Sequence, residues 1–196
     1  MSTSSPGSRP AGGARDRVLA AALELFGEHG VSGTSLQMIA DRIGVTKAAV
    51  YHQFHTKEEI VLGVLGPAMD SLHASLDRSE QLESPEARRE SMLTAVVDLA
   101  VGNRRLAAIL RADPAAAELV RSHPDLDVGD RIRALLVGPA PDARSEVAGA
   151  MVGGALMMIG AAPELERYGD EELRANLLEL ARDVLDRHVG HRHAEA

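Results

Sequence analysis

The sequence contains no cysteine and no tryptophan, and it has only two phenylalanines and two tyrosines among its 196 residues. The absence of cysteine excludes disulfides, thiolate metal sites and a cysteine nucleophile, and it fits a reducing compartment. With so little aromatic bulk, a hydrophobic core must be built from Ala, Leu, Val, Ile and the seven Met, which suit closely packed helices. Because 45% of the residues are apolar and 26% are charged, the composition predicts a folded, all-α protein.

Long hydrophobic runs are also missing. The first ten residues contain no apolar stretch that resembles an export signal. The longest uncharged run, residues 147–163, is shorter than the ~20 residues that a membrane-spanning helix needs. We therefore expect no membrane segment and a cytoplasmic location.

Positive charge is scarce, since the net charge is −8 at pH 7. Residues 1–66 hold six basic and six acidic side chains, whereas residues 67–196 hold 15 basic and 23 acidic ones. Phosphate neutralisation needs Lys and Arg, so the overall charge opposes nucleic-acid binding. The balanced N-terminal third remains compatible with it.

Common catalytic motifs are absent as well. The sequence has no G-x-S-x-G, H-E-x-x-H, GxxxxGK[ST] or G-x-G-x-x-G pattern, and we predict no catalytic residue and no cofactor. His188, His191 and His193 cluster near the C-terminus, but no carboxylate lies at a fixed helical spacing from them. A solvated, His-rich end is therefore favoured over a metal site.

Helical periodicity begins at Ala14, and Gly30 stands where a left-handed C-cap would end the first helix. Threonines provide N-cap signals for the next three helices, two of them with a capping-box partner: Thr34 with Gln37, Thr46, and Thr56 with Glu59. The expected core of this region is Val18, Leu25, Phe26, Ile39, Ala40, Ile43, Val50 and Phe54.

Beyond residue 80, start signals at Ser84-Pro85, Asp113-Pro114, Pro141-Asp142 and Asp170 precede further helices. We expect these helices near 85–101, 104–112, 114–122, 127–137, 142–162 and 170–189. No segment alternates β-branched residues, so no sheet is predicted.

Two short helices joined by Gly44-Val45 have the spacing of a helix-turn-helix, whose second helix lies in the DNA major groove. The stretch TSLQMIADRIGVTKAAVYHQFHTKEEIVL, residues 34–62, follows a helix that ends in LFGEHGVSG. This amino-acid sequence closely resembles the DNA-binding domain of the TetR family of bacterial transcriptional regulators. The resemblance implies a helix-turn-helix DNA-binding domain (14–62) and a larger helical ligand-binding and dimerisation domain (63–189), followed by a tail (190–196). The Ser, Gly and Pro content of residues 1–13 predicts a flexible N-terminal arm, with a plain disordered tail as the alternative.

The resemblance also implies which residues contact DNA: Thr34, Ser35, Thr46, Lys47, Ala48, Ala49, Tyr51, His52 and Lys57. Hydroxyls at the start of the second helix, together with its free N–H groups, suit a phosphate, although simple capping is the alternative. An outward-facing tyrosine is unusual for stability and useful against DNA. A lysine at the start of the fourth helix opposes the helix dipole unless an anion is bound.

One departure from the family concerns Ala48 and Ala49, where the family often has Gly or a hydroxyl residue. These alanines offer only close approach or contact with a thymine methyl group. Base recognition therefore rests on few side chains, and the operator sequence is not predictable.

The helix expected at 142–162 is crowded with small residues: Ala148, Gly149, Gly153, Gly154, Ala155 and Gly160. Glycine costs ~1 kcal/mol in a helix interior relative to alanine, so this crowding predicts close approach of another helix. In TetR-like proteins the last two long helices of each subunit form a four-helix dimer bundle. The expected interface is Gly149, Gly153, Leu173, Leu177, Leu180 and Val184, with intramolecular core as the alternative.

Candidate ligand-pocket residues are apolar side chains of the middle helices: Met92, Val96, Leu99, Leu106, Leu110, Met151 and Met158. Methionine adapts to varied ligands, but it also fills ordinary cores. The sequence indicates no ligand class.

Together these observations predict a ligand-responsive transcriptional repressor that binds palindromic, double-stranded operator DNA as a homodimer and responds to an unknown small-molecule effector. Two alternatives stay open at this point. The chain could be a helical dimeric small-molecule-binding protein without DNA function, or an enzyme whose acidic helical domain turns over a small molecule.

Overall fold

The computed structural model describes residues 13–123, 128–159 and 162–189. Within these ranges the regular elements are all helical, which confirms the predicted fold class. The chain divides into two compact units between Val64 and Leu65, close to the expected boundary at residue 62. The predicted arm, apart from Gly13, and the predicted tail lie outside the described residues.

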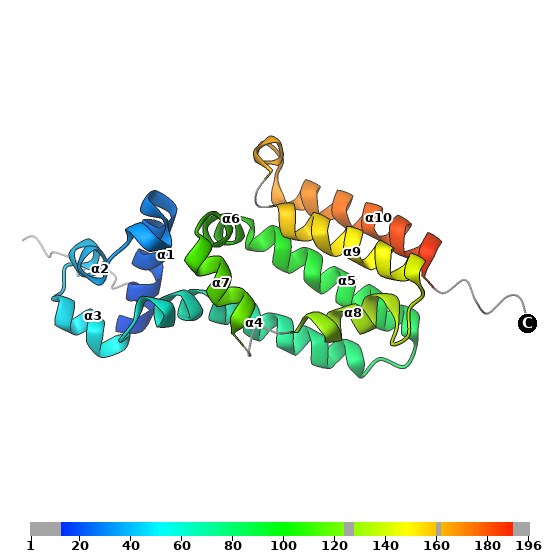
Figure 1. Ribbon diagram of the computed structural model, residues 1–196, viewed down its shortest axis with the longest axis horizontal. Helices are drawn as coiled ribbons and strands as arrows, with labels where there is room; N and C mark the ends of the chain where they lie inside the picture. The colour runs from blue at the N-terminus through cyan, green and yellow to red at the C-terminus, as the bar shows by residue number, and fades with distance from the viewer. Residues whose placement is uncertain (1–12, 124–127, 160–161, 190–196) are drawn as a thin grey trace, which may run out of the picture. The chain divides into compact units, whose positions relative to one another are not determined.

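The first unit contains three helices and the start of a fourth (Figure 1): α1 (Ala14–Gly33), α2 (Leu36–Ile43), α3 (Lys47–Gln53) and α4 (Lys57–Glu80). Regular helical geometry in α1 is interrupted at Gly30, whose φ of 72° is strained for any residue with a side chain. The break falls where a helix end was predicted, but the ψ of 167° at Gly30 differs from that of a left-handed C-cap, and α1 continues to Gly33.

The start of α2 differs from the prediction by one residue. Ser35 Oγ accepts the N–H of Met38 at 3.2 Å and is the N-cap. The hydroxyl of Thr34 instead donates to the carbonyl of Gly30 at 2.8 Å, and Gln37 donates to Asp41. The capping box predicted for Thr34 and Gln37 is wrong, because the turn at Gly30 presents a carbonyl that takes the Thr34 hydroxyl.

The other two threonine caps are confirmed. Thr46 Oγ1 accepts the N–H of Ala49 at 3.2 Å, and Thr56 Oγ1 accepts the N–H of Glu59 at 3.1 Å. The Glu59 carboxylate accepts the N–H of His55 at 2.8 Å, one residue before the Thr56 N–H that the predicted capping box would use.

Apolar side chains of all four helices meet in the core of the first unit. Seven of the eight predicted core residues are buried: Val18, Leu25, Phe26, Ile39, Ala40, Val50 and Phe54. Ile43 is only half-buried, because it lies in the last turn of α2. Arg42 in the same turn holds Glu24 and Glu28 of α1 at 3.1 and 2.7 Å and fixes α2 against α1.

In the described part of the second unit, the rest of α4 is followed by six α-helices and one short 3₁₀ helix: α5 (Pro85–Gly102), α6 (Arg104–Ala112), α7 (Pro114–Ser122), α8 (Gly129–Val137), α9 (Ala143–Met158), η3 (Pro163–Leu165) and α10 (Asp170–His188). The caps predicted at Ser84, Asp113 and Asp142 each accept a backbone N–H from the first turn. Helix α9 ends at Met158, and Ala162 has an extended backbone before Pro163, so the helix end predicted at residue 162 is wrong. Residues 127 and 160–161 lie outside the described residues.

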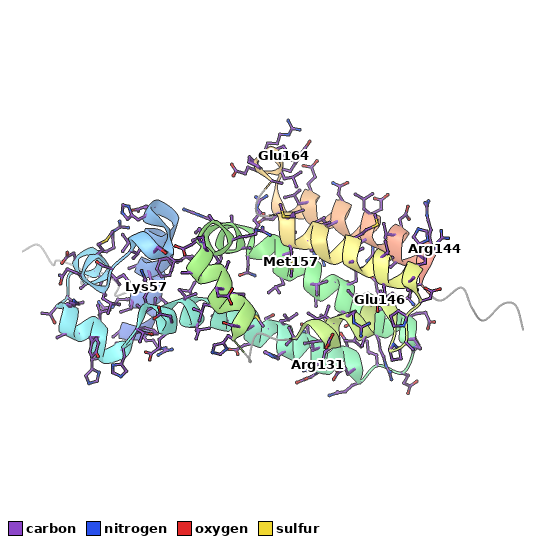
Figure 2. The ribbon with its side chains drawn as sticks, viewed as in Figure 1. Lys57, Arg131, Arg144, Glu146, Met157 and Glu164 are labelled. Carbon is purple, nitrogen blue, oxygen red and sulfur yellow. The ribbon has the colours of Figure 1, made fainter. Side chains whose placement is uncertain are left out.

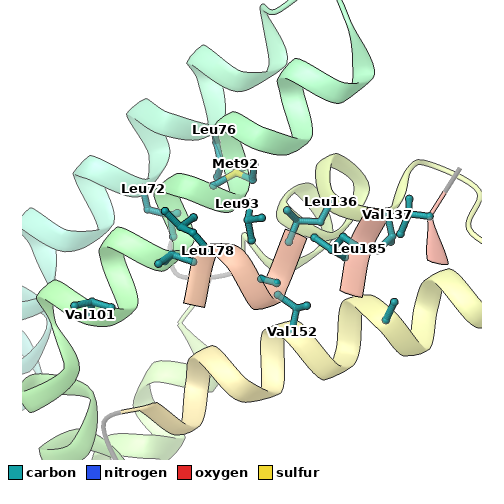
Figure 3. Close-up of a cluster of buried hydrophobic side chains, with 14 of the residues drawn as sticks. Leu72, Leu76, Met92, Leu93, Val101, Leu136, Val137, Val152, Leu178 and Leu185 are labelled. Atoms are coloured by element: carbon teal, nitrogen blue, oxygen red, sulfur yellow. The ribbon is translucent and has the colours of Figure 1, made fainter. Parts of the chain in front are cut away.

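Helix α5 packs against α8 and α10, and α9 packs against both of these (Figure 1). Their shared core includes Leu76, Met92, Leu93, Val97 and Leu185, each at most 1% exposed (Figure 3). Among the described residues, no helix combines the length and the apolar composition needed to cross a bilayer.

Candidate nucleic-acid interface

The turn between α2 and α3 fixes the direction of α3. Gly44 has φ 71° and ψ 38°, the left-handed conformation that ends a helix, and the N–H of Val45 donates to the carbonyl of Ala40. Val50 is 0% exposed and Phe54 just after α3 is 1% exposed. Because these two side chains anchor α3 to the core, its opposite face is held outward.

The outward face of α3 forms a shallow recess that is open to solvent. Its lining residues are Lys47, Ala48, Tyr51, His52 and His55, and no carboxylate is among them. Tyr51 is 53% exposed, as its predicted position on the outward face requires. A helix-turn-helix thus presents a cationic and aromatic face that suits phosphates and base edges.

His55 belongs to this face and was missed by the sequence analysis. Its ring meets the Tyr51 ring edge-on, with centroids 5.1 Å apart. The signal that could have found it was its position four residues after an exposed tyrosine, but the end of α3 at Gln53 obscured it.

The start of α2 holds two of the predicted contact residues in different environments. Thr34 is 2% exposed and its hydroxyl is engaged by Gly30, whereas Ser35 is exposed. A phosphate at this helix N-terminus would therefore meet Ser35 and the free N–H groups. Thr34 supports the turn behind them.

Lys57 lies at the first position of α4, where a cation opposes the helix dipole (Figure 2). Its amine donates to the carbonyls of Ser32 and Thr34, both at 3.1 Å. These carbonyls offset the unfavourable interaction of the Lys57 charge with the helix dipole, a role that the sequence analysis gave to a bound phosphate. One of the three ammonium protons remains for a DNA contact, which stays a prediction.

The remaining predicted contacts are exposed: Thr46, Ala48, Ala49 and His52. Arg15 lies with its guanidinium carbon 4.3 Å from the centre of the Phe54 ring, a cation–π contact within the first unit. Arg42 lowers the pKa of Glu28 by hydrogen bonding to it, but this pair joins α1 to α2 and lies outside the recess.

The seven candidate pocket residues do not share one environment. Met92 is fully buried in the core, and Val96 and Leu99 pack against that core. Leu106 and Leu110 are each 7% exposed on α6, whereas Met151 and Met158 are 61% and 54% exposed on α9. The two exposed methionines lie on the outer face of α9 because Ala148 and Val152 occupy its inner face.

The candidate interface residues also divide between inside and outside. A Cβ at Gly149 would lie 2.8 Å from Val137, so this glycine permits close approach of α8 within the same chain. Leu173 is buried, Leu177 and Val184 are half-buried, and Leu180 is 64% exposed. A Cβ at Gly153 would meet nothing within 4 Å.

The described residues contain no group of three or more side chains that could hold a metal ion. His188 accepts a hydrogen bond at Nδ1 from Arg144 at 2.8 Å. His191 and His193 lie outside the described residues.

Comparison with known proteins agrees with this geometry. Residues 18–64 match the family model "Bacterial regulatory proteins, tetR family". The HTH-type transcriptional regulator SrpR of Pseudomonas putida is 40% identical over 83 residues, which are 42% of this chain and 39% of SrpR. The uncharacterized HTH-type transcriptional regulator YezE of Bacillus subtilis is 32% identical over 75 residues, 38% of either chain. The match thus spans about two fifths of these relatives.

Solved structures share the fold over almost the whole chain. The ketosteroid transcriptional regulator KstR2 of Mycobacterium tuberculosis aligns with a TM-score of 0.68 and 18% identity, covering 94% of this chain and 98% of KstR2. The TetR family transcriptional regulator PfmR of Thermus thermophilus aligns with a TM-score of 0.62 and 22% identity, covering 87% and 98%. These proteins are transcriptional regulators, not enzymes. The chain therefore contains, at residues 18–64, a domain of the TetR family of bacterial regulatory proteins.

Proposed function

We propose that this chain is a transcriptional repressor that binds a palindromic operator as a homodimer and releases it when a small molecule binds the second unit. The observation that carries the proposal is the outward face of α3. A 53% exposed tyrosine lies beside Lys47 and His52 on a helix whose other face is buried at Val50. Such a surface gains no stability from exposing the ring, and it fits a major groove.

The homodimer is supported by an apolar surface on the second unit. The outer face of α9 exposes Val147, Met151 and Met158 at 59%, 61% and 54%, and Leu180 of α10 is 64% exposed. The three α9 residues lie one or two helical turns apart, so they form a continuous stripe. A second copy of the same stripe would bury it by two-fold symmetry.

The exposed surface of α9 and α10 changes which residues we assign to the dimer interface. Leu180, Leu177 and Val184 stay in it, whereas Gly149 and Leu173 serve the fold of one chain. Met151 and Met158 move from the candidate pocket to the interface. Two-fold symmetry of the dimer matches two-fold symmetry of the operator, with half-sites about 34 Å or more apart.

The proposed function places the protein in the cytoplasm, where bacterial operators are. A ligand acts by favouring a conformation in which the two α3 helices are wrongly spaced for DNA. Its effect is bounded by its differential affinity for the two states. Repression fits this scheme because ligand binding then frees the operator.

A fluorescence anisotropy titration of DNA from the region upstream of the chain's own coding sequence tests the proposal. We expect tight binding to a palindrome in that region and at least about 10-fold weaker binding by Tyr51→Ala, since one base-edge or groove contact is worth ~1–3 kcal/mol. Leu23→Ala is a matched control, because Leu23 of α1 is an exposed apolar side chain outside the recess. Equal affinity of the wild-type chain for the palindrome and for a scrambled duplex would contradict the proposal.

A further inference from the structure

A second pocket lies within the second unit, between the first turn of α5, the α8–α9 connection and the end of α10. Its volume is about 920 Å³, which falls in the range of small-molecule sites. None of the residues that the sequence analysis assigned to a ligand pocket or an interface lines it. Figure 2 shows Arg144, one of its lining residues, in the first turn of α9.

One part of the pocket wall is apolar. It consists of Ala134, Leu135 and Val137 from the last turn of α8, followed by Pro139 and Pro141 of the connection. The two prolines restrict the backbone of this wall, so little conformational entropy remains to be lost when a ligand binds. The wall can therefore hold the hydrocarbon part of a ligand.

The rest of the lining is rich in guanidinium groups. Arg88, Arg89, Arg144 and Arg187 line the pocket against two carboxylates, Glu86 and Asp142. This local excess of positive charge contrasts with residues 67–196 as a whole, which hold 15 basic and 23 acidic side chains. The pocket lining thus holds more basic than acidic side chains, in a part of the chain where acidic side chains predominate.

Two of the four arginines are neutralised within the chain. Arg89 pairs with Asp186 at 3.5 Å, and Arg187 pairs with Asp183 at 2.9 Å. The first pair joins α5 to α10 and the second lies within α10, and both compensate the charge of the arginine.

The other two arginines have neutral partners. Arg88 donates from Nε to the carbonyl of Leu82 at 2.6 Å, and Arg144 donates from Nε to the imidazole of His188 at 2.8 Å. Each contact holds the Nε atom of a guanidinium group and uses one of the five N–H donors of that group. In both arginines the terminal N–H groups remain for a ligand, and their geometry matches bidentate binding of a carboxylate.

We propose that this pocket binds an organic carboxylate with an apolar body. The guanidinium groups of Arg88 and Arg144 bind the carboxylate, and the wall formed by α8 and the two prolines binds the apolar body. Arg88 lies on α5 and Arg144 on α9, so a shared carboxylate joins two helices that both contact α8.

This site deepens the proposed function and, in its regulatory consequence, rests on it. Arg131 lies on α8 before the pocket wall, and its guanidinium donates to Asp77 at 2.9 Å and to Glu80 at 2.9 and 3.0 Å. Both acceptors are on α4, which begins at Lys57 in the first unit. A ligand that shifts α8 therefore acts on the helix that continues into the DNA-binding unit.

Isothermal titration calorimetry of the full chain with octanoate and with 1-octanol tests the site, because the two probes share their apolar body and differ in charge. We expect one octanoate per chain, with at least about 10-fold weaker binding of octanol. Arg88→Gln and Arg144→Gln should each weaken octanoate by about 5- to 30-fold, as expected for loss of a charge-assisted hydrogen bond of ~1–2 kcal/mol. Octanol binding should not change.

Arg105→Gln is the matched control, since Arg105 is exposed on α6 and lies outside the pocket. An equal loss in this variant would overturn the site, because bulk charge would then explain the binding. Octanol binding as tight as octanoate, or inorganic phosphate binding as tight as octanoate, would overturn the proposed ligand class. Unchanged melting temperatures establish that the variants are folded.

The two proposals fail separately in this design. Octanoate that binds while the chain ignores its palindrome leaves the pocket in place and removes the regulatory role. DNA binding without octanoate binding overturns the pocket and keeps the proposed function. When both bind, octanoate is expected to weaken the DNA complex in the wild-type chain and not in Arg88→Gln.

Discussion

The two units differ in how they treat apolar side chains. Among its described residues, the first unit buries or half-buries its large apolar side chains apart from Leu23, and it exposes Tyr51 on a face with Lys47 and His52. The second unit exposes Val147 and Met151, together with Leu180, on neighbouring helices. The first surface suits a charged, hydrated polyanion, and the second suits another protein surface. In the proposed function, the chain therefore uses separate surfaces for DNA contact and for self-association.

Substitution of Phe54 by alanine should have the largest effect on the first unit. Phe54 is 1% exposed, and its ring packs against Gly63 of α4. A Cβ atom added to Gly63 would lie 3.2 Å from Cε1 of the ring. Its removal leaves a cavity, so we expect a loss of about 3–5 kcal/mol in the free energy of unfolding. Urea unfolding followed by circular dichroism measures it.

Tyr51→Ala is the matched control for Phe54→Ala. Because Tyr51 is 53% exposed, its loss should change the unfolding free energy by less than about 0.5 kcal/mol while it weakens DNA binding. Equal destabilisation by both variants would mean that Tyr51 is a packing residue. The contrast between the two faces of α3 would then be wrong.

Met151→Asp tests the exposed face of the second unit. A charge in the proposed interface should convert a dimer of twice 20.8 kDa into a monomer of 20.8 kDa, measured by light scattering. DNA affinity should fall by at least about 100-fold, since one α3 helix supplies half of the specific contacts. Ala175→Asp adds the same charge at a position of α10 outside the stripe, and dissociation of that variant as well would argue against a localised interface.

The predictability of the fold also differs between the units, for physical reasons. In the first unit, local rules specify Thr46 as a cap and Gly30 as a helix end, because these signals act over three or four residues. The one error in capping, Thr34 for Ser35, arose because two adjacent hydroxyls compete. The choice between them depends on a carbonyl that the turn at Gly30 presents.

In the second unit, the helix starts were predictable and the orientation of the helices was not. Helix α9 has apolar or small residues around most of its circumference, so periodicity does not distinguish the inward Gly149 from the outward Met151. The pocket near Arg88 and Arg144 was missed because its lining comes from segments far apart in the sequence. His55 was missed because it follows the end of its helix.

Lys47→Ala and Lys57→Ala sharpen the comparison within the DNA-binding unit and should have smaller effects. Each phosphate contact contributes about 0.9 to the slope of log affinity against log salt, so each variant should lower that slope by about this amount. Lys57→Ala should also lower the melting temperature, because the carbonyls of Ser32 and Thr34 lose a donor. A lower melting temperature with an unchanged slope would assign Lys57 to the fold alone.

The smallest expected effect is a dependence of the melting temperature on pH in the acidic range. Hydrogen bonding from Arg182 lowers the pKa of Glu90, against an opposing effect of burial, and this pair links α5 to α10. A carboxyl with a lowered pKa in the folded state contributes stability above its unfolded value of 4.5, and this stability is lost as the pH falls through the folded value. Melting temperatures of wild type and Arg182→Gln should therefore converge below pH 4.5. A constant difference at all pH values would exclude this linkage.

The most direct test of the central claim is the mass of the complex between the full chain and a palindromic duplex from its own upstream region, measured by light scattering. Separate surfaces for DNA contact and self-association predict a protein mass in the complex of twice 20.8 kDa, or a multiple of that pair. They also predict that Tyr51→Ala remains a dimer while losing the complex. A complex that contains a single chain of 20.8 kDa, or a Tyr51→Ala variant that becomes a monomer, would contradict the account.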